Sequence, residues 1–328
     1  MGVVDTRVIT IAKQTAWGTP VTTSTAKLMH IDSAKFEPQV DGELVSGQRG
    51  TLAPAATSII NKITGKLTLQ GTLTYEDAPY LFDSLFPIAT PGAGPGYARA
   101  YAGVTKRQTA PSLTRLSTIF IIDEDGAYYL QDSLLSKLSL EGKAFEKVKY
   151  TAEFIGTAVA SGADAGTPAD RALTIVHTGD LTIKRGAAGA TFSGLSALGI
   201  CSQSFKMDFD PSRQFIPCMG ARTPSAYYER AWKVGMSASF TFANALASAG
   251  FTPTNPTSLP THNMRYSFNG GTNKTMDIDL ALAQLKAPAL WNDADGLTTV
   301  AIDAAARYDA GTATWVAINV ANAVSTMA

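Results

Sequence analysis

Cysteine is scarce in this sequence, with Cys201 and Cys218 the two instances in 328 residues. Two such distant cysteines form neither a disulfide framework nor a CxxC metal pair, so we expect reduced thiols that act as small hydrophobic side chains. The three histidines, His30, His177 and His262, are scattered and not grouped at metal-ligand spacing. The sequence therefore predicts no metal site and no cofactor.

Charge is also sparse. Charged residues make up 16% of the chain, below the roughly 25% that is usual in globular proteins. The 27 basic and 27 acidic side chains cancel, and no Lys/Arg-rich run offers a phosphate-binding patch, so a tightly held nucleic acid is not expected. The low charge fits either a surface covered by partners or a Thr/Ser/Asn-rich monomeric β protein.

Long apolar runs and catalytic motifs are missing too. No run reaches the length of a membrane span, and the N-terminal MGVVDTRVITIAKQ lacks a signal-peptide core, so we expect synthesis in the cytoplasm without a membrane anchor. Pro95 interrupts the glycines of TPGAGPGYA (90–98), DEDG (123–126) lacks the rest of a calcium loop, and no GxSxG occurs. No enzyme and no catalytic residue is predicted.

Two stretches share a change of hydrophobic period. Residues 66–75 alternate polar and apolar side chains as a half-buried strand does, and Ala78, Leu81, Phe82 and Leu85 then take the spacing of an amphipathic helix. Thr74 and Asp77 resemble a capping box, with Pro79 in the first turn. Residues 233–242 alternate in the same way before a helix candidate at 243–250.

The order of expected elements also repeats. Each half reads strand, long loop, strand, helix, hairpin, strand, strand. The first half places these at 33–40, 41–62, 66–75, 78–85, 114–130, 135–142 and 148–158, and the second at 204–210, 211–232, 233–242, 243–250, 263–280, 300–309 and 314–322. Repeats of about half the chain indicate duplicated domains. The predicted division is a domain at 1–160, a linker at 161–172 and a domain at 173–328.

Several phrases carry a family resemblance. The first half contains AKQTAWGTPVT (12–22), then the loop with GQRG, and then GKLTLQGTLTYEDAPYLFDSLF (65–86). The second half contains FKMDFD and WKVGMSASFTF. This arrangement resembles the tail tube (major tail) proteins of long-tailed, non-contractile bacteriophages. The resemblance covers essentially the whole chain as two copies of one tube domain.

The resemblance implies a mainly β fold of two tandem β-sandwich or half-barrel tube domains, each with one short flanking helix. It implies a virion protein whose rings stack into the tail tube, with inner sheets that join edge to edge across subunits. The implied partners are the tape-measure protein and the tail terminator or tip proteins. DNA would pass through the tube without specific binding. Two domains per chain suggest homotrimeric rings with pseudo-sixfold symmetry, although many single-domain relatives form hexamers.

Two sets of residues are candidates for roles in such a tube. Alternate residues share a strand face, so two pairs of acids are predicted as negative stripes that face the lumen, or else as solvated acids on an outer face: Asp208 with Asp210, and Asp277 with Asp279. The first-half counterparts are mixed, with Lys35 and Glu37. The two long loops supply the candidate contacts between rings: Glu43, Arg49, Arg213 and Arg222.

Other interpretations stay open at this point. One is a tail-tip or distal ring protein of related fold, which would not polymerise alone. Another is a carbohydrate-binding β-sandwich adhesin, for which Tyr227, Tyr228 and Trp232 would form an aromatic platform. An outer-membrane barrel is disfavoured by the lack of a signal peptide and by the two expected helices.

Overall fold

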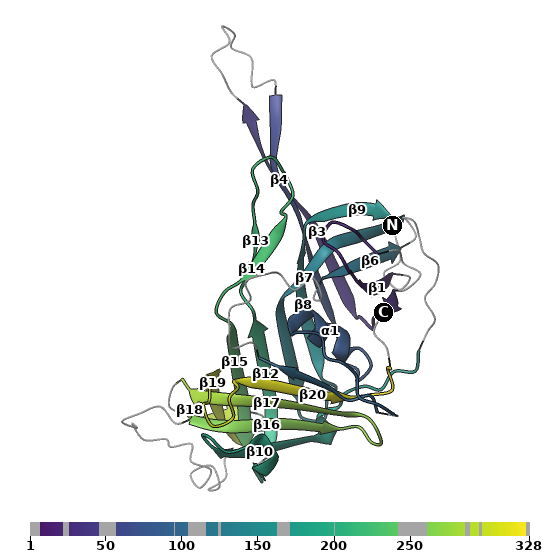
Figure 1. Cartoon of the computed structure of the whole chain (residues 1–328). Helices are drawn as coiled ribbons and strands as arrows, with labels where there is room; N and C mark the ends of the chain where they lie inside the picture. Colours follow the sequence, from purple (N-terminus) through teal and green to yellow (C-terminus); the bar gives the residue numbers. More distant parts are fainter. Residues whose placement is uncertain are drawn as a thin grey trace.

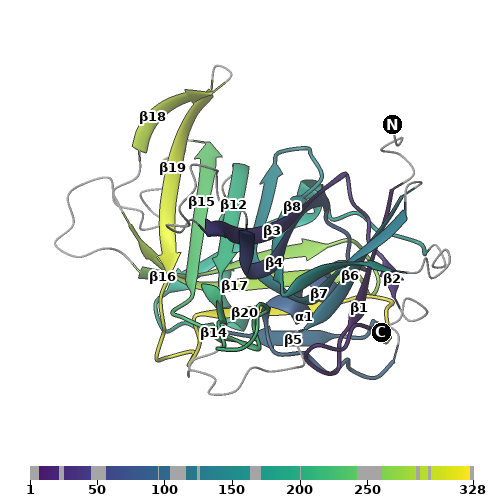
Figure 2. The ribbon, with the colours of Figure 1, turned by 90° about the horizontal axis from the view of Figure 1, so that it is seen from above.

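The computed structural model describes residues 7–21, 26–45, 57–94, 96–103, 116–123, 126–162, 171–199, 201–241, 261–285, 289–294 and 297–325. Within these residues the chain is mainly β, with one α-helix, as the sequence predicts. Figures 1 and 2 show layered sheets, and Figure 1 shows one long hairpin that projects from them.

The first half holds nine strands and the helix: β1 (Val8–Lys13), β2 (Lys27–Leu28), β3 (Ser33–Val45), β4 (Thr57–Thr72), α1 (Ala78–Leu85), β5 (Arg99–Ala102), β6 (Ser117–Asp123), β7 (Gly126–Lys143), β8 (Lys149–Gly156) and β9 (Ala158–Gly162). The second half holds the remaining strands: β10 (Leu181–Ala187), β11 (Ser196–Ala197), β12 (Ser202–Asp210), β13 (Arg213–Ile216), β14 (Ala226–Glu229), β15 (Lys233–Thr241), β16 (Thr261–Asn269), β17 (Thr275–Gln284), β18 (Ala289–Ala294), β19 (Leu297–Ala306) and β20 (Val316–Ala321).

One antiparallel sheet runs through both halves. Its strands pair in the order β3, β4, β8, β7, β12, β15, β19, β18, and we call it the main sheet. Figure 2 shows β12, β15, β19 and β18 side by side in this sheet. Two further layers cover one of its faces: β2–β1–β6–β7–β9 in the first half, and β11–β10–β16–β17–β20–β5 in the second. A single apolar core lies between the layers and continues from one half to the other.

Every ladder within the first half has a counterpart in the second, whereas β13–β14 has none in the first. β1 pairs with β2 and β6 as β10 pairs with β11 and β16, and β3–β4 matches β12–β15. The β4–β8 ladder matches β15–β19. β7 pairs with β6, β8 and β9 in the same way as β17 pairs with β16, β19 and β20, respectively. Strand pairing therefore repeats, but with a different correspondence from the one read from the sequence. β8 corresponds to β19 and β9 to β20, whereas the sequence order matched 135–142 with 300–309 and 148–158 with 314–322.

Strand β7 is longer than the sequence pattern predicts. The second strand of the 114–130 hairpin and the strand at 135–142 were expected to be separate, but β7 joins them and crosses from the first-half layer into the main sheet. The crossing is at Asp132, which has a φ of 49°. Its buried carboxylate accepts hydrogen bonds from Gln14, from the Gly18 N–H at 2.8 Å and from the Thr157 hydroxyl at 2.6 Å. Three donors therefore hold this corner in place.

Helix α1 is present where the period predicts it, and every one of its residues is buried. The Thr74 hydroxyl accepts from the Asp77 N–H at 3.0 Å and donates to the Asp77 carboxylate at 2.8 Å. This reciprocal bond forms in the turn before the helix, because Asp77 and not Thr74 occupies the N-cap position. The second helix candidate, 243–250, lies outside the described residues.

Each of the predicted long loops contains the strands of a hairpin. β3 continues to Val45 and β4 begins at Thr57, so the described parts of 41–62 form a hairpin, which we call the arm. In the second half, β13 and β14 form a shorter hairpin within 211–232. β-branched residues such as Ile59, Ile60 and Ile63 favour a strand, a signal that the nearby Gly and Pro residues obscure. The predicted linker also begins later, because β9 extends through Gly162.

Candidate assembly surfaces

The two halves join through a strand ladder. β12 of the second half pairs with the end of β7 from Ser204↔Lys143 to Phe209↔Leu138, and Lys206 stands opposite Glu141. The Ser139 hydroxyl also donates to the Asp208 carboxylate, and the Ala144 N–H donates to the Gln203 carbonyl at 2.8 Å. An edge of one half thus pairs with an edge of the other.

The matching ladders leave one corresponding strand edge open in each half. β3 is the counterpart of β12, since Lys35 pairs with Thr68 as Lys206 pairs with Ser237. β18 is the counterpart of the end of β7, since Asn292 pairs with Thr299 as Glu141 pairs with Lys149. Among the described residues β3 pairs with β4 alone and β18 with β19 alone. Each therefore keeps an open edge at the place where β12 and β7 meet.

The uncovered face of the main sheet is polar and mixed in charge. Buried and more exposed residues alternate along β7, β8, β12 and β15, and the more exposed set faces away from the core. Acids and lysines stand opposite one another on neighbouring strands: Lys206 and Glu141, Glu141 and Lys149, Glu153 and Lys137, and Asp210 and Lys233. Asp208 and Asp210 belong to this face, but lysines interrupt the negative stripe that the sequence predicts.

Asp277 and Asp279 lie elsewhere. They belong to β17 in the second-half layer, and Ile278 between them points into the core. Asp279 is 2% exposed, and Arg265 donates to its carboxylate at 2.6 and 2.8 Å. Asp277 accepts from the Ser267 hydroxyl at 2.5 Å and lies 3.6 Å from Arg265. These hydrogen bonds raise the pKa of Arg265, while burial raises the pKa of Asp279 and Arg265 opposes that rise.

The two acid pairs therefore occupy opposite outer faces of the second half, and one channel wall cannot contain both. This placement corrects the prediction that both acid pairs line the same channel. Within each strand the two acids do lie on one side, because alternate residues share a face. The sequence pattern does not reveal that Arg265 on β16 lies opposite Asp279.

The predicted inter-ring residues have different surroundings. Glu43 is exposed on the arm, Arg222 is exposed on the loop between β13 and β14, and Arg49 lies outside the described residues. The Arg222 carbonyl accepts from the Ile63 N–H at 3.1 Å, which ties the two hairpins together. Figure 1 shows the β13–β14 hairpin alongside the base of the arm.

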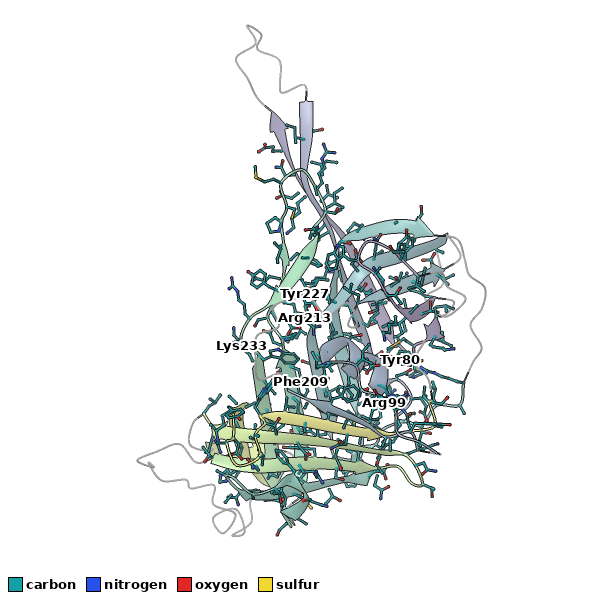
Figure 3. All side chains as sticks on the ribbon, viewed as in Figure 1. Tyr80, Arg99, Phe209, Arg213, Tyr227 and Lys233 are labelled. Carbon is teal, nitrogen blue, oxygen red and sulfur yellow. The ribbon has the colours of Figure 1, made fainter. Side chains whose placement is uncertain are left out.

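Arg213 is not a surface residue, which corrects its prediction as a contact between rings. It is 5% exposed at the base of the β13–β14 hairpin (Figure 3). Its guanidinium donates to the carbonyls at the end of α1, Ser84 and Leu85, at 2.6 and 2.8 Å. It also donates to Leu135 O at 2.7 Å and to Glu229 at 3.0 Å. A cation suits the C-terminal end of a helix, so Arg213 fixes the hairpin to α1.

The aromatic platform of the adhesin alternative is largely covered. Tyr227 is buried and its ring stacks on that of Trp17, with centroids 6.3 Å apart. Trp232 stacks on Phe86 at 5.2 Å. Of the three residues, Tyr228 alone remains on the hairpin surface, where its hydroxyl donates to Gln214.

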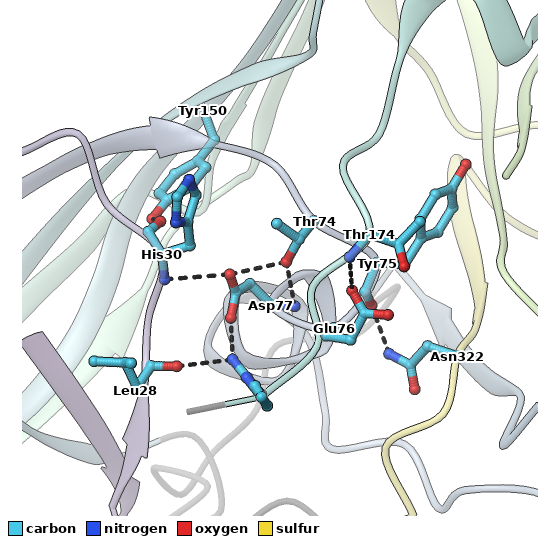
Figure 4. Close-up of polar contacts among 10 residues, drawn as sticks. Leu28, His30, Thr74, Tyr75, Glu76, Asp77, Tyr150, Thr174 and Asn322 are labelled. Carbon is cyan, nitrogen blue, oxygen red and sulfur yellow. Dashed lines mark hydrogen bonds and ion pairs between the residues drawn. The ribbon is translucent and has the colours of Figure 1, made fainter. Parts of the chain in front are cut away.

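A buried polar cluster that sequence analysis missed lies at the junction of the halves (Figure 4). The Asp77 carboxylate accepts from the His30 N–H at 3.3 Å and from the side chains of Thr74 and Arg171. Arg171 also donates to the Leu28 carbonyl at 2.8 Å. Burial raises the pKa of Asp77, and Arg171 opposes that rise. Arg171 thus fastens the start of the second half to α1.

The end of the chain is held at the same junction. The Asn322 amide donates to the Tyr75 carbonyl at 2.5 Å, and the Thr174 N–H donates to Glu76 at 2.7 Å. Arg99 on β5 is buried and donates to Asn322 at 3.3 Å. No local spacing signals these partners, which are as much as 247 residues apart. The cluster orients the halves and does not form an open site.

Other chemical signals are few. The described part of the chain contains no group of three metal-ligating side chains, and no helix within it is long and apolar enough to cross a bilayer. The His177 ring accepts from the Gly179 N–H at 2.9 Å, while burial and Arg185 lower the pKa of His262 to about 4. Both cysteines are free, as expected, but exposed and not packed in the core.

Comparison of the chain with models of known protein families gives no match, and comparison with curated proteins gives none either.

Proposed function

We propose that this chain is the structural subunit of a bacteriophage tail tube, in which three copies close into a ring and the rings stack into a conduit for DNA. In this proposal the two halves are tandem tube domains. One observation carries it: the β7–β12 ladder joins the halves edge to edge, while the corresponding edges of β3 and β18 remain open.

Open antiparallel edges at both sides of a sheet favour addition of another sheet. Repeating the β7–β12 contact between β18 of one copy and β3 of the next uses both edges. Because a fixed rotation relates successive halves, repeated addition closes a ring if the rotation divides a full turn. Six halves, and hence three chains, give the pseudo-sixfold ring that the tube resemblance implies.

The same arrangement selects the face toward the channel. The main sheet would continue around the whole ring, and the first- and second-half layers already cover its apolar face. The polar face would then line the lumen, with Asp208 and Asp210 in it and Asp277 and Asp279 outside. Lysines opposite acids would leave little net field to hold phosphates, which suits passage of DNA without specific binding.

The same proposal places the protein in the virion after synthesis in the host cytoplasm, without catalytic activity or a cofactor. Its partners would be other copies of the chain, the tape-measure protein and the tail terminator and tip proteins. A tail-tip or distal ring protein is the alternative, and it differs in one observable respect. Its purified rings would not stack into tubes.

A disulfide between chains tests the ring contact. The counterpart of the Lys206↔Glu141 pair is Lys35 of one copy opposite Asn292 of the next. In a chain with C201S and C218S, we expect K35C with N292C to oxidise into covalent trimers, and K35C alone to remain uncrosslinked. Paired Cβ atoms across a ladder lie roughly 4.5–5.5 Å apart, within reach of a disulfide with small adjustment. Rings that assemble yet never crosslink at this pair would contradict the proposed contact.

A further inference from the structure

Phe145 has an unusual conformation and environment. It lies in the turn between β7 and β8 with a φ of 65°, and it is 93% exposed. A positive φ is unfavourable for a bulky side chain, and an aromatic ring in water gains nothing for the isolated chain. Backbone outliers of this kind are found where a function requires them.

The turn is held in place and borders a hollow. The Thr178 hydroxyl lies 2.9 Å from the Lys143 carbonyl and 2.8 Å from that of Glu146. Beside it is a hollow of about 320 Å³ whose lining includes Lys143, Phe145 and Thr178. Lys143 and Lys147, two residues before and two after Phe145 in the chain, are exposed. We call Lys143, Phe145, Lys147 and this hollow the turn-end surface.

The turn-end surface and the arm lie at opposite ends of the main sheet. β8 pairs with β4 from Thr72↔Lys149, next to the turn, to Gly65↔Gly156. The arm begins beyond Gly65 and extends through eight more residues of β4, 57–64, a length of roughly 26 Å at the rise of a strand. Head-to-tail stacking of copies therefore brings an arm toward a turn-end surface.

The arm has side chains that complement this surface. Val40 is 59% exposed, and Ile59 and Ile60 are also exposed. Asp41 and Glu43 are exposed acids beside them. A lone two-stranded hairpin is marginally stable in water, so an arm with uncovered apolar side chains favours a partner. Phe145 offers apolar area, and Lys143 and Lys147 offer the opposite charge, although Glu146 in the turn and Lys62 opposite Asp41 on the arm reduce the net charge of each surface.

We propose that the turn-end surface receives the β3–β4 arm of a second copy of this chain, in the adjoining ring. Phe145 packs against the exposed Val40, Ile59 and Ile60, and Lys143 and Lys147 lie near Asp41 and Glu43. This proposal rests on the proposed tube function and adds the surface to which the arm binds. It explains why an aromatic ring occupies a position whose φ favours glycine.

The first test removes the ring. Glycine adopts a φ of 65° without strain, so F145G keeps the turn while it deletes the contact. We expect rings of unchanged mass, an unchanged or higher melting temperature, and ring-to-ring association weaker by about tenfold or more, as for a central aromatic anchor. The matched control is Y128S, which removes an exposed aromatic side chain from the first-half layer and should stack as wild type. Sedimentation velocity and tube lengths in electron micrographs give the readout.

A charge swap tests the partner. We expect K143E/K147E and D41K/E43K each to weaken stacking at low salt, and the combined variant to recover it, because the swapped pairs again attract. F145G rings that stack like wild type, or a combined variant that does not recover, would overturn the proposal. Failure of the wild-type chain to form rings would instead overturn the tube function, whereas rings that stack independently of Phe145 and these charges would leave that function intact.

Discussion

Several single residues in this chain matter because they fix one segment on another. Arg213 is the clearest case, since four acceptors on three segments surround one buried guanidinium. Such a residue cannot be recognised from its neighbours in the sequence, because an arginine in a Gly- and Pro-rich stretch has the signature of an exposed loop. Its burial depends on α1, 129 residues away in the chain.

Replacement of Arg213 is predicted to lower the free energy of unfolding far more than replacement of Arg222. R213A leaves Glu229 and three carbonyls without their buried donor, so we expect a loss of about 3–5 kcal/mol in the free energy of unfolding. R222A changes an exposed side chain and should alter it by less than about 0.5 kcal/mol. Urea denaturation of the two variants measures the difference. Equal losses would show that Arg213 does not anchor the hairpin.

Asp83 on α1 gives a prediction about pH. Burial raises the pKa of its carboxyl to about 6, and Tyr101 and Arg99 offset only part of that effect. The folded chain therefore holds a proton that the unfolded chain, with a pKa near 4, releases. Stability from this group is complete below about pH 4 and falls as the pH rises through 6, by about 2–3 kcal/mol in total. Asparagine cannot ionise, so D83N should gain in melting temperature over wild type as the pH rises from 4 to 7. A difference that stays constant over this range would contradict the assignment.

At the scale of elements, period and turn signals predicted most strands of the described chain. The hairpin around Asn269 and the alternating strands 204–210 and 233–241 are where the sequence places them. Predictions failed where tertiary contacts decide the outcome. Asp132 allows one strand to serve two layers, and the arm is a hairpin because Val40 to Val45 find partners in β4. The open edges of β3 and β18 could not be predicted, because pairing partners are not encoded in local spacing.

The arm itself is predicted to be needed for stacking and not for folding. It extends beyond the last pairing of β4 with β8, so the core and the β7–β12 ladder do not depend on its tip. Deletion of residues 46–57 should leave a folded chain that still forms rings but no longer forms tubes. Circular dichroism checks the fold, native mass measurement checks the rings, and electron microscopy checks the tubes. Tubes of normal length from this variant would show that residues 46–57 are not needed to link rings.

At the scale of the whole molecule, the contact proposed between copies is already present within one chain, as the β7–β12 ladder between its two halves. The halves share a core, a main sheet and a buried junction at Asp77 and Arg171, so their relative orientation is fixed within the chain. A fixed orientation at this contact gives a ring of defined size when its rotation divides a full turn, and an open filament when it does not.

The number of chains in an isolated ring tests this account most directly. Native mass measurement, together with rotational averages of end views in electron micrographs, gives both the mass and the apparent symmetry. The account predicts three chains per ring with a nearly sixfold outline, because each chain supplies two corresponding halves. Six chains per ring, or assemblies that never close, would contradict it.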